Sequence, residues 1–336
     1  MKADGPRPGQ GAAPRVDRAS AAARSRPCSL RLGEQAGRLA AAALLVFAAA
    51  APAGAEWRWS ARERKQIAAL EARVEKGKDF PFRLEGRRWN VETAVSARFT
   101  AELALFMDSF SDAFDGLMKE LDAEPLVERK PTVQVYASRA DYAKQHTNGS
   151  RGYYRYRWDA DGRFTELHLY TFVEWPRERE FSRFYHPILL HEGTHVLLRV
   201  RLGKAANVKW LDEGTATWFQ FYDLRASVKA NRKTRARRST FRKDLARALA
   251  KGPRLSDLLS LGPLTFNPDG MGPKALEHYG LAESFVDFLL SSRRGAEVYK
   301  QAFHRLREGK VPLLEPALVA RLEGPWLAHA RRVAGR

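Results

Sequence analysis

The stretch HEGTH, residues 191–195, followed by WLDEGTATW, residues 210–218, decides how this sequence folds. His191 and His195 are four residues apart, so on a helix both imidazoles lie on one face and can reach one metal ion. Glu192 projects beside them and can accept a proton from water. Glu213, in the second stretch, opens an apolar run and can supply a third ligand. Two histidines, one carboxylate and an open fourth position are the arrangement of a catalytic zinc site.

The residues around these stretches indicate two consecutive helices. Apolar residues recur in steps of three and four and predict a helix over about 177–202, with Pro176 in its first turn. Both histidines fall in its apolar stripe, which faces the core. A second helix is expected to begin near Asp212 and to carry Glu213. A pair of core histidines is the structural alternative, but their placement in the stripe and the following Glu favour a metal site.

The first 55 residues differ from the rest of the chain. An apolar run, LAAAALLVFAAAA at 39–51, follows a basic flank and precedes Ala53-Gly54-Ala55. This combination predicts a secretory signal peptide at about 31–55, and hence a periplasmic or secreted protein. An uncleaved membrane anchor is the alternative. The single cysteine, Cys28, lies in this leader, so the exported chain is expected to have no disulfide.

The remaining chain predicts an α+β fold, because strand patterns alternate with helix patterns and helices then continue to the end. It is expected to be one domain over 56–336, with a small mixed-sheet lobe at about 80–203 and a helical lobe at about 204–336. The elements expected before the motif are a helix over 56–75, a strand over 87–95, a helix over 97–123, a strand over 131–138, a short helix ending near His146, and a hairpin over 152–171 turning at Asp161-Gly162; after it, one helix is expected over 273–292.

A strongly basic segment lies between the second motif and the last of these helices. Residues 225–247 hold ten Lys and Arg against one acid, Asp244, in a chain whose net charge is +19. A solvated face is the simple interpretation. Contact with an anionic envelope surface or an acidic substrate is the functional one. The sequence contains no nucleic-acid-binding motif.

HEGTHVLL and WLDEGTATWF resemble the gluzincin branch of zinc metallopeptidases, in which a Glu on the following helix completes the site. The closest likeness is to the bacterial peptidase MA-like proteins, over roughly residues 87–292. The resemblance implies a zincin-like fold and a Zn2+ ion bound by His191, His195 and Glu213, with Glu192 as the general base.

The same resemblance makes Tyr279 a candidate hydrogen-bond donor to the oxyanion, with His278 as the alternative. The chain departs from better-studied gluzincins because it has no acidic residue in the turn after Glu213. Asp212 is then the candidate to support the ligands from outside. The expected function is that of an exported zinc metallopeptidase acting on a peptide or protein. Two alternatives are a catalytically silent zincin-fold scaffold of the cell envelope and an amidase of cell-wall peptides.

Overall fold

The fold is described from a computed structural model. It covers residues 57–126, 129–146, 150–160, 163–184, 186–205, 207–234, 239–267 and 271–335. The expected leader and signal peptide over 1–55, and the turn at Asp161-Gly162, lie outside these residues. Across the described ranges, no helix combines the length and the apolar character that crossing a membrane requires.

Five strands form one mixed sheet in the order β1-β2-β3-β5-β4. β2, β3 and β5 are parallel neighbours, whereas β1 and β4 pair antiparallel at the two edges. Alternate residues such as Val133 and Val135 are fully buried, as expected for a sheet with one face against the core. The strands are β1 (Phe82–Glu85), β2 (Asn90–Thr93), β3 (Thr132–Tyr136), β4 (Gly152–Trp158) and β5 (Phe164–Phe172).

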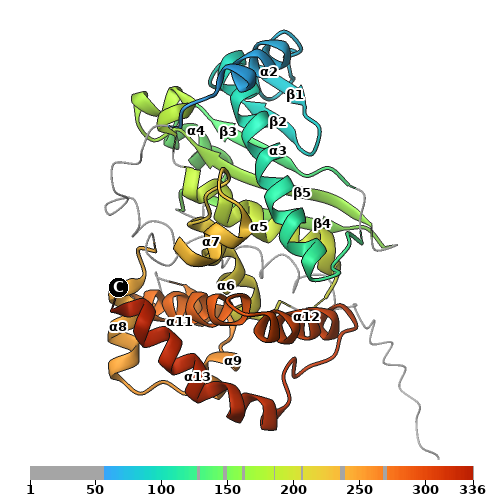
Figure 1. The fold of residues 1–336 in the computed structure, drawn as a ribbon. Coiled ribbons are helices and arrows are strands. Elements are labelled where there is room, and N and C mark those ends of the chain that lie inside the picture. Colours follow the sequence, from blue (N-terminus) through green and yellow to red (C-terminus); the bar gives the residue numbers. More distant parts are fainter. Residues whose placement is uncertain are drawn as a thin grey trace, which may run out of the picture.

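Helices flank this sheet and continue beyond it. In Figure 1 the sheet lies with α2 to α5 in the upper half of the molecule, and α8, α9 and α11 to α13 lie in the lower half. The α-helices are α2 (Ala61–Glu71), α3 (Ala97–Glu120), α4 (Arg139–Gln145), α5 (His186–Leu202), α6 (Lys209–Gln220), α7 (Val228–Thr234), α8 (Arg242–Ala250), α9 (Leu255–Leu259), α11 (Pro273–Leu290), α12 (Arg293–Arg307) and α13 (Pro316–Ala334). The expected α+β class is confirmed.

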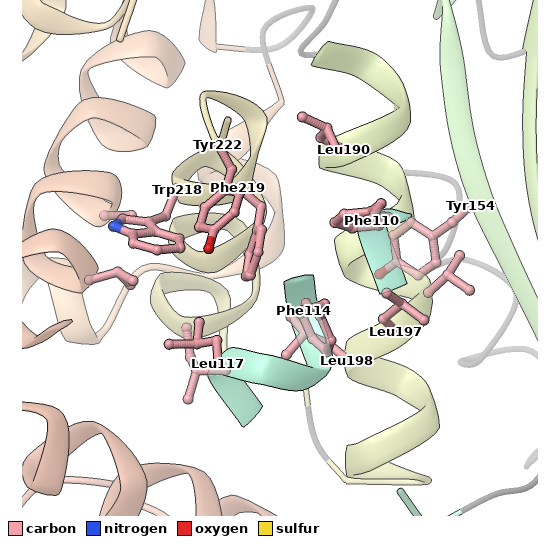
Figure 2. Packing of buried hydrophobic residues seen from close by; sticks show 14 of the residues in the cluster. Phe110, Phe114, Leu117, Tyr154, Leu190, Leu197, Leu198, Trp218, Phe219 and Tyr222 are labelled. Carbon is pink, nitrogen blue, oxygen red and sulfur yellow. The ribbon is translucent and has the colours of Figure 1, made fainter. Parts of the chain in front are cut away.

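An apolar layer joins α3, α5 and α6 (Figure 2). Phe110 and Phe114 of α3 contact the ring of Phe219 from α6, with ring centres 5.9 and 5.2 Å apart. Leu197 and Leu198 of α5 belong to the same buried cluster. Each fully buried side chain of this size contributes about 1.5–3 kcal/mol to folding, so this layer holds the two motif helices in place.

The helix that carries HEGTH begins later than the sequence pattern predicts. The expectation of a helix from residue 177 is wrong: Pro176 opens a 3-10 helix, η2 (Pro176–Arg179), and a second one, η3 (Phe181–Arg183), follows before α5. The reason is Pro187, whose ring would clash with a preceding helical turn and whose nitrogen cannot donate. In the first turn of α5 the same proline is tolerated.

Candidate metal centre

α5 and α6 bring three ligand atoms into one small triangle. The Nε2 atoms of His191 and His195 lie 3.3 Å apart, and Oε2 of Glu213 lies 3.6 and 3.5 Å from them. In a tetrahedral zinc site with metal–ligand distances of about 2.0–2.1 Å, neighbouring ligand atoms lie about 3.3–3.4 Å apart. This buried group could therefore hold a metal ion, and its spacing fits zinc.

Two glycines allow the helices to approach closely enough. Gly193 follows Glu192, and a Cβ there would lie 2.7 Å from the ring of Phe110. Gly214 follows Glu213, and a Cβ there would lie 2.7 Å from the carbonyl oxygen of Ala282 on α11. No side chain fits at such distances unless the Phe110 ring or the backbone of α11 moves. The glycines after both glutamates in the motifs thus set the positions of α5 and α6.

The outer nitrogen of each histidine is fixed by a partner on α6. Nδ1 of His195 donates to Oδ1 of Asp212 at 2.9 Å, which gives Asp212 the supporting position expected for it. Nδ1 of His191 donates to Oε1 of Gln220 at 3.1 Å. Each bond leaves Nε2 free to bind a metal. Gln220 was not predicted from the sequence, although its place seven residues after Glu213 puts it on the same face of α6.

Lys209 completes the surroundings of Glu213. Its Nζ donates to Oε1 of Glu213 at 2.9 Å and lies 3.6 Å from Oδ2 of Asp212, with 2% of the residue exposed. Burial opposes the charged form of Glu213, but Lys209 and His195 hold its pKa well below the usual range. Lys209 thus occupies one oxygen of Glu213 and leaves Oε2 facing the histidines. This lysine was not predicted from the sequence.

The metal-free centre takes up positive charge. Burial opposes protonation of His195, yet Asp212 and Glu213 raise the pKa of this imidazole to about 10. The two carboxylates therefore attract a cation to the position between them. A divalent metal ion satisfies the same electrostatic demand.

Glu192 is a buried acid whose charge interacts with those of His195 and Glu213. It is 0% exposed, and neither of its carboxyl oxygens has a hydrogen-bond partner among the residues described. Burial raises its pKa to about 8; Glu213 and Asp212 add to the rise, and His195 acts in the opposite direction. An unpartnered buried carboxyl group costs stability, so a structural role does not account for it.

Tyr279 lies near the centre, but its hydroxyl group already has an acceptor. The ring is 1% exposed, its centre lies 6.2 Å from that of His191, and its hydroxyl donates to the carbonyl of Phe266 at 3.1 Å. Burial and the nearby Glu213 raise its pKa well above the usual value. The imidazole of His278 also has an acceptor already, because its Nδ1 donates to the carbonyl of Thr265 at 2.7 Å.

The basic segment over 225–247 is described only in part, since residues 235–238 and the side chains of 232 and 233 lie outside the described structure. Arg225 stacks over the ring of Trp57, with 4.3 Å from its guanidinium carbon to the ring centre. Arg242 donates to the carbonyl of Val333, and Arg247 pairs with Asp244. These three arginines contact the protein itself.

The chain matches no model of a known protein family, and no curated protein matches it. The likeness to gluzincins consequently depends on the residues of the two motifs and on the geometry of the centre.

Proposed function

We propose that this protein is an exported zinc-dependent peptidase with a zincin-like fold of the gluzincin type. The observation that carries the proposal is the position of Glu192. Glu192 follows His191 in the sequence, and its unpartnered buried carboxyl group interacts electrostatically with His195 and Glu213. His191, His195 and Glu213 present three ligand atoms at the spacing of a zinc site.

In this proposal His191, His195 and Glu213 hold the ion, while Asp212, Gln220 and Lys209 fix their orientation. Zinc, when bound, acts as a Lewis acid and lowers the pKa of water towards neutrality. The carboxylate of Glu192 accepts a proton from the attacking water and passes it to the nitrogen of the leaving amine. Tyr279 is a candidate donor to the oxyanion once its hydroxyl exchanges the Phe266 carbonyl for the substrate.

The second candidate is a catalytically silent scaffold of the envelope that keeps a structural zinc ion. The burial of the centre favours it, because His191 is 2% exposed and His195 and Glu213 are 0% exposed. A peptide reaches these atoms only when the covering elements separate. Glu192 argues for turnover, since a structural site gains nothing from an additional, unpartnered acid.

Cleavage of a mixed peptide library, with and without a chelator, tests the proposal. The library includes cell-wall peptides, so that an amidase is detected in the same assay. We expect metal-dependent cleavage that falls at least about a hundredfold in Glu192→Gln, because the amide cannot accept the proton of water. Glu192→Gln should still bind one zinc ion.

Glu277→Gln is the matched control, since Glu277 is buried but pairs with Lys251 away from the centre. Equal cleavage by wild type and Glu192→Gln would reject the proposed base. Zinc binding without any cleavage would favour the scaffold. N-terminal sequencing of the exported protein tests the predicted processing near residue 55.

A further inference from the structure

Arg199 is a buried cation with an unused hydrogen-bonding edge. It follows His195 by one helical turn on α5, and 1% of the residue is exposed. Its Nη1 donates to the carbonyl of Ala205 at 3.0 Å, but Nε and Nη2 have no hydrogen-bond partner in the described part of the chain. The N–H groups of Nε and Nη2 point in the same direction. This is the edge through which a guanidinium binds a carboxylate by two parallel bonds.

A second unpartnered group lies on the same seam between β4 and α5. The ring of Tyr154 stacks on the imidazole of His195, with centres 4.7 Å apart and planes inclined by 20°. Its hydroxyl is buried and has no partner among the described residues. Figure 2 shows this ring beside α5. Two residues further along β4, the ring centre of Tyr156 lies 5.8 Å from the guanidinium carbon of Arg199. Tyr154 of β4 thus lies beside His195 of α5, and Tyr156 lies beside Arg199, one helical turn further along α5.

The free edge of Arg199 indicates what this seam binds. Within the residues described, the charge of Asp212 interacts with Arg199, but no carboxylate hydrogen-bonds to its Nε or Nη2. Buried donors without acceptors cost stability. Asp212 accepts from His195 through Oδ1 and Glu213 accepts from Lys209 through Oε1, and neither acid hydrogen-bonds to Arg199 in the described structure. An anionic group with two acceptor oxygens would satisfy the free edge of Arg199 and could accept from the Tyr154 hydroxyl as well.

We propose that Arg199, assisted by Tyr154, binds a carboxylate of the substrate, and that the peptidase therefore prefers peptides with an acidic group close to the scissile bond. The carboxylate can come from an Asp or Glu side chain or from a free C-terminus. This inference depends on the proposed peptidase function for its catalytic part, whereas the binding of a carboxylate does not require turnover.

The first test uses the wild-type protein with matched peptides. Each pair carries Glu or Gln at one position on either side of the cleaved bond, and a further pair ends in a free carboxylate or an amide. We expect one position of the acid to raise kcat/KM by about tenfold to a hundredfold, the effect of hydrogen bonds to a charged group. An effect of Glu against Gln identifies a side-chain carboxylate as the bound group, whereas an effect of the free carboxylate against the amide identifies the C-terminus. A preference below twofold at every position would overturn the proposal and indicate that only internal water meets Arg199.

The second test uses variants and a binding assay without turnover. Arg199→Gln should bring the ratio of kcat/KM between the acidic peptide and its neutral counterpart to about one. Arg199→Lys keeps the charge and should retain part of the preference, and Tyr154→Phe should reduce it. Calorimetry with N-acetyl-Ala-Glu-Ala-amide and its Gln counterpart measures binding directly in each folded variant.

The binding result separates the two proposals. Preferential binding of the Glu peptide by wild type but not by Arg199→Gln, without cleavage of any peptide, would reject the peptidase function and retain the carboxylate site. Cleavage with equal kcat/KM for acidic and neutral peptides would retain the peptidase function and reject the carboxylate site.

Discussion

Lys209 and Glu213 form a buried ion pair one helical turn apart on α6, with Nζ of the lysine 2.9 Å from Oε1 of the glutamate. The two carboxylate oxygens of Glu213 therefore face different partners. One is bound by the protein, and the other faces His191 and His195. A ligand held in this way is oriented before any metal arrives.

The folded protein should bind one zinc ion per chain and gain stability from it. At a free zinc concentration of a hundred times Kd, binding contributes about 2.7 kcal/mol, which corresponds to roughly 5–10 °C in Tm for a domain of this size. Elemental analysis and thermal unfolding with and without a chelator check this. His195→Ala should lose both the ion and the gain in Tm, and an unchanged gain would place the metal elsewhere.

Lys209→Met should destabilise the metal-free protein by about 3–5 kcal/mol, because two buried carboxylates then lose their cation. Zinc replaces part of the missing charge, so the gain in Tm on adding zinc should exceed that of wild type. Lys209→Arg keeps the charge and serves as the control. Equal gains in wild type and Lys209→Met would show that the lysine does not compensate these carboxylates.

Gln220→Leu should weaken zinc binding by about 10–100-fold, since His191 loses the acceptor that fixes its ring. Competition with a chromophoric chelator measures the affinity. Gln220→Glu retains an acceptor oxygen and should bind zinc at least as tightly as wild type. An affinity of Gln220→Leu within twofold of wild type would contradict the assigned role.

His146 should make the protein less stable in acid. Burial, and then Arg155, lower its pKa to about 4, from 6.5 in the unfolded chain. Between these pH values the imidazole is protonated in the unfolded state but not in the folded state. The contribution of neutral His146 to the free energy of unfolding is therefore fully present above pH 6.5 and is lost as the pH falls towards 4. The loss is at most about 3 kcal/mol.

Urea unfolding at several pH values, for wild type and His146→Gln, measures this contribution of His146. The difference in unfolding free energy between the two proteins should change with pH between 4 and 6.5 and stay constant above that window. A difference independent of pH would show that His146 titrates normally in the folded protein.

Periodicity in the sequence predicted most elements, because burial of one face leaves a clear pattern. The long helix over 97–123 is found as α3 over Ala97–Glu120, and the hairpin over 152–171 is found as β4 and β5. β1 was missed, since FRLE is short and only Leu84 in it is buried. The start of α5 was placed too early because an apolar stripe does not register the effect of Pro187.

The grouping of the three candidate metal ligands was predictable from the spacing of HExxH and the later Glu, and the structure brings the three residues together. Their supporting residues were harder to predict. Lys209 resembles an ordinary surface residue at a helix start, and only the tertiary fold shows that 2% of it is exposed. Gln220 has no charge or apolar pattern that would mark it. Both depend on how α6 lies against α5.

The close contact at Gly214, where α6 meets Ala282 of α11, has a consequence for which metal ion the proposed centre would hold. Ligands enclosed by tightly packed helices exchange their ion only when that packing opens, so exchange follows the rate of local unfolding. Intrinsic affinities of nitrogen and oxygen ligands favour copper over zinc. The ion would therefore be selected by the compartment in which the chain folds, and retained afterwards by slow release.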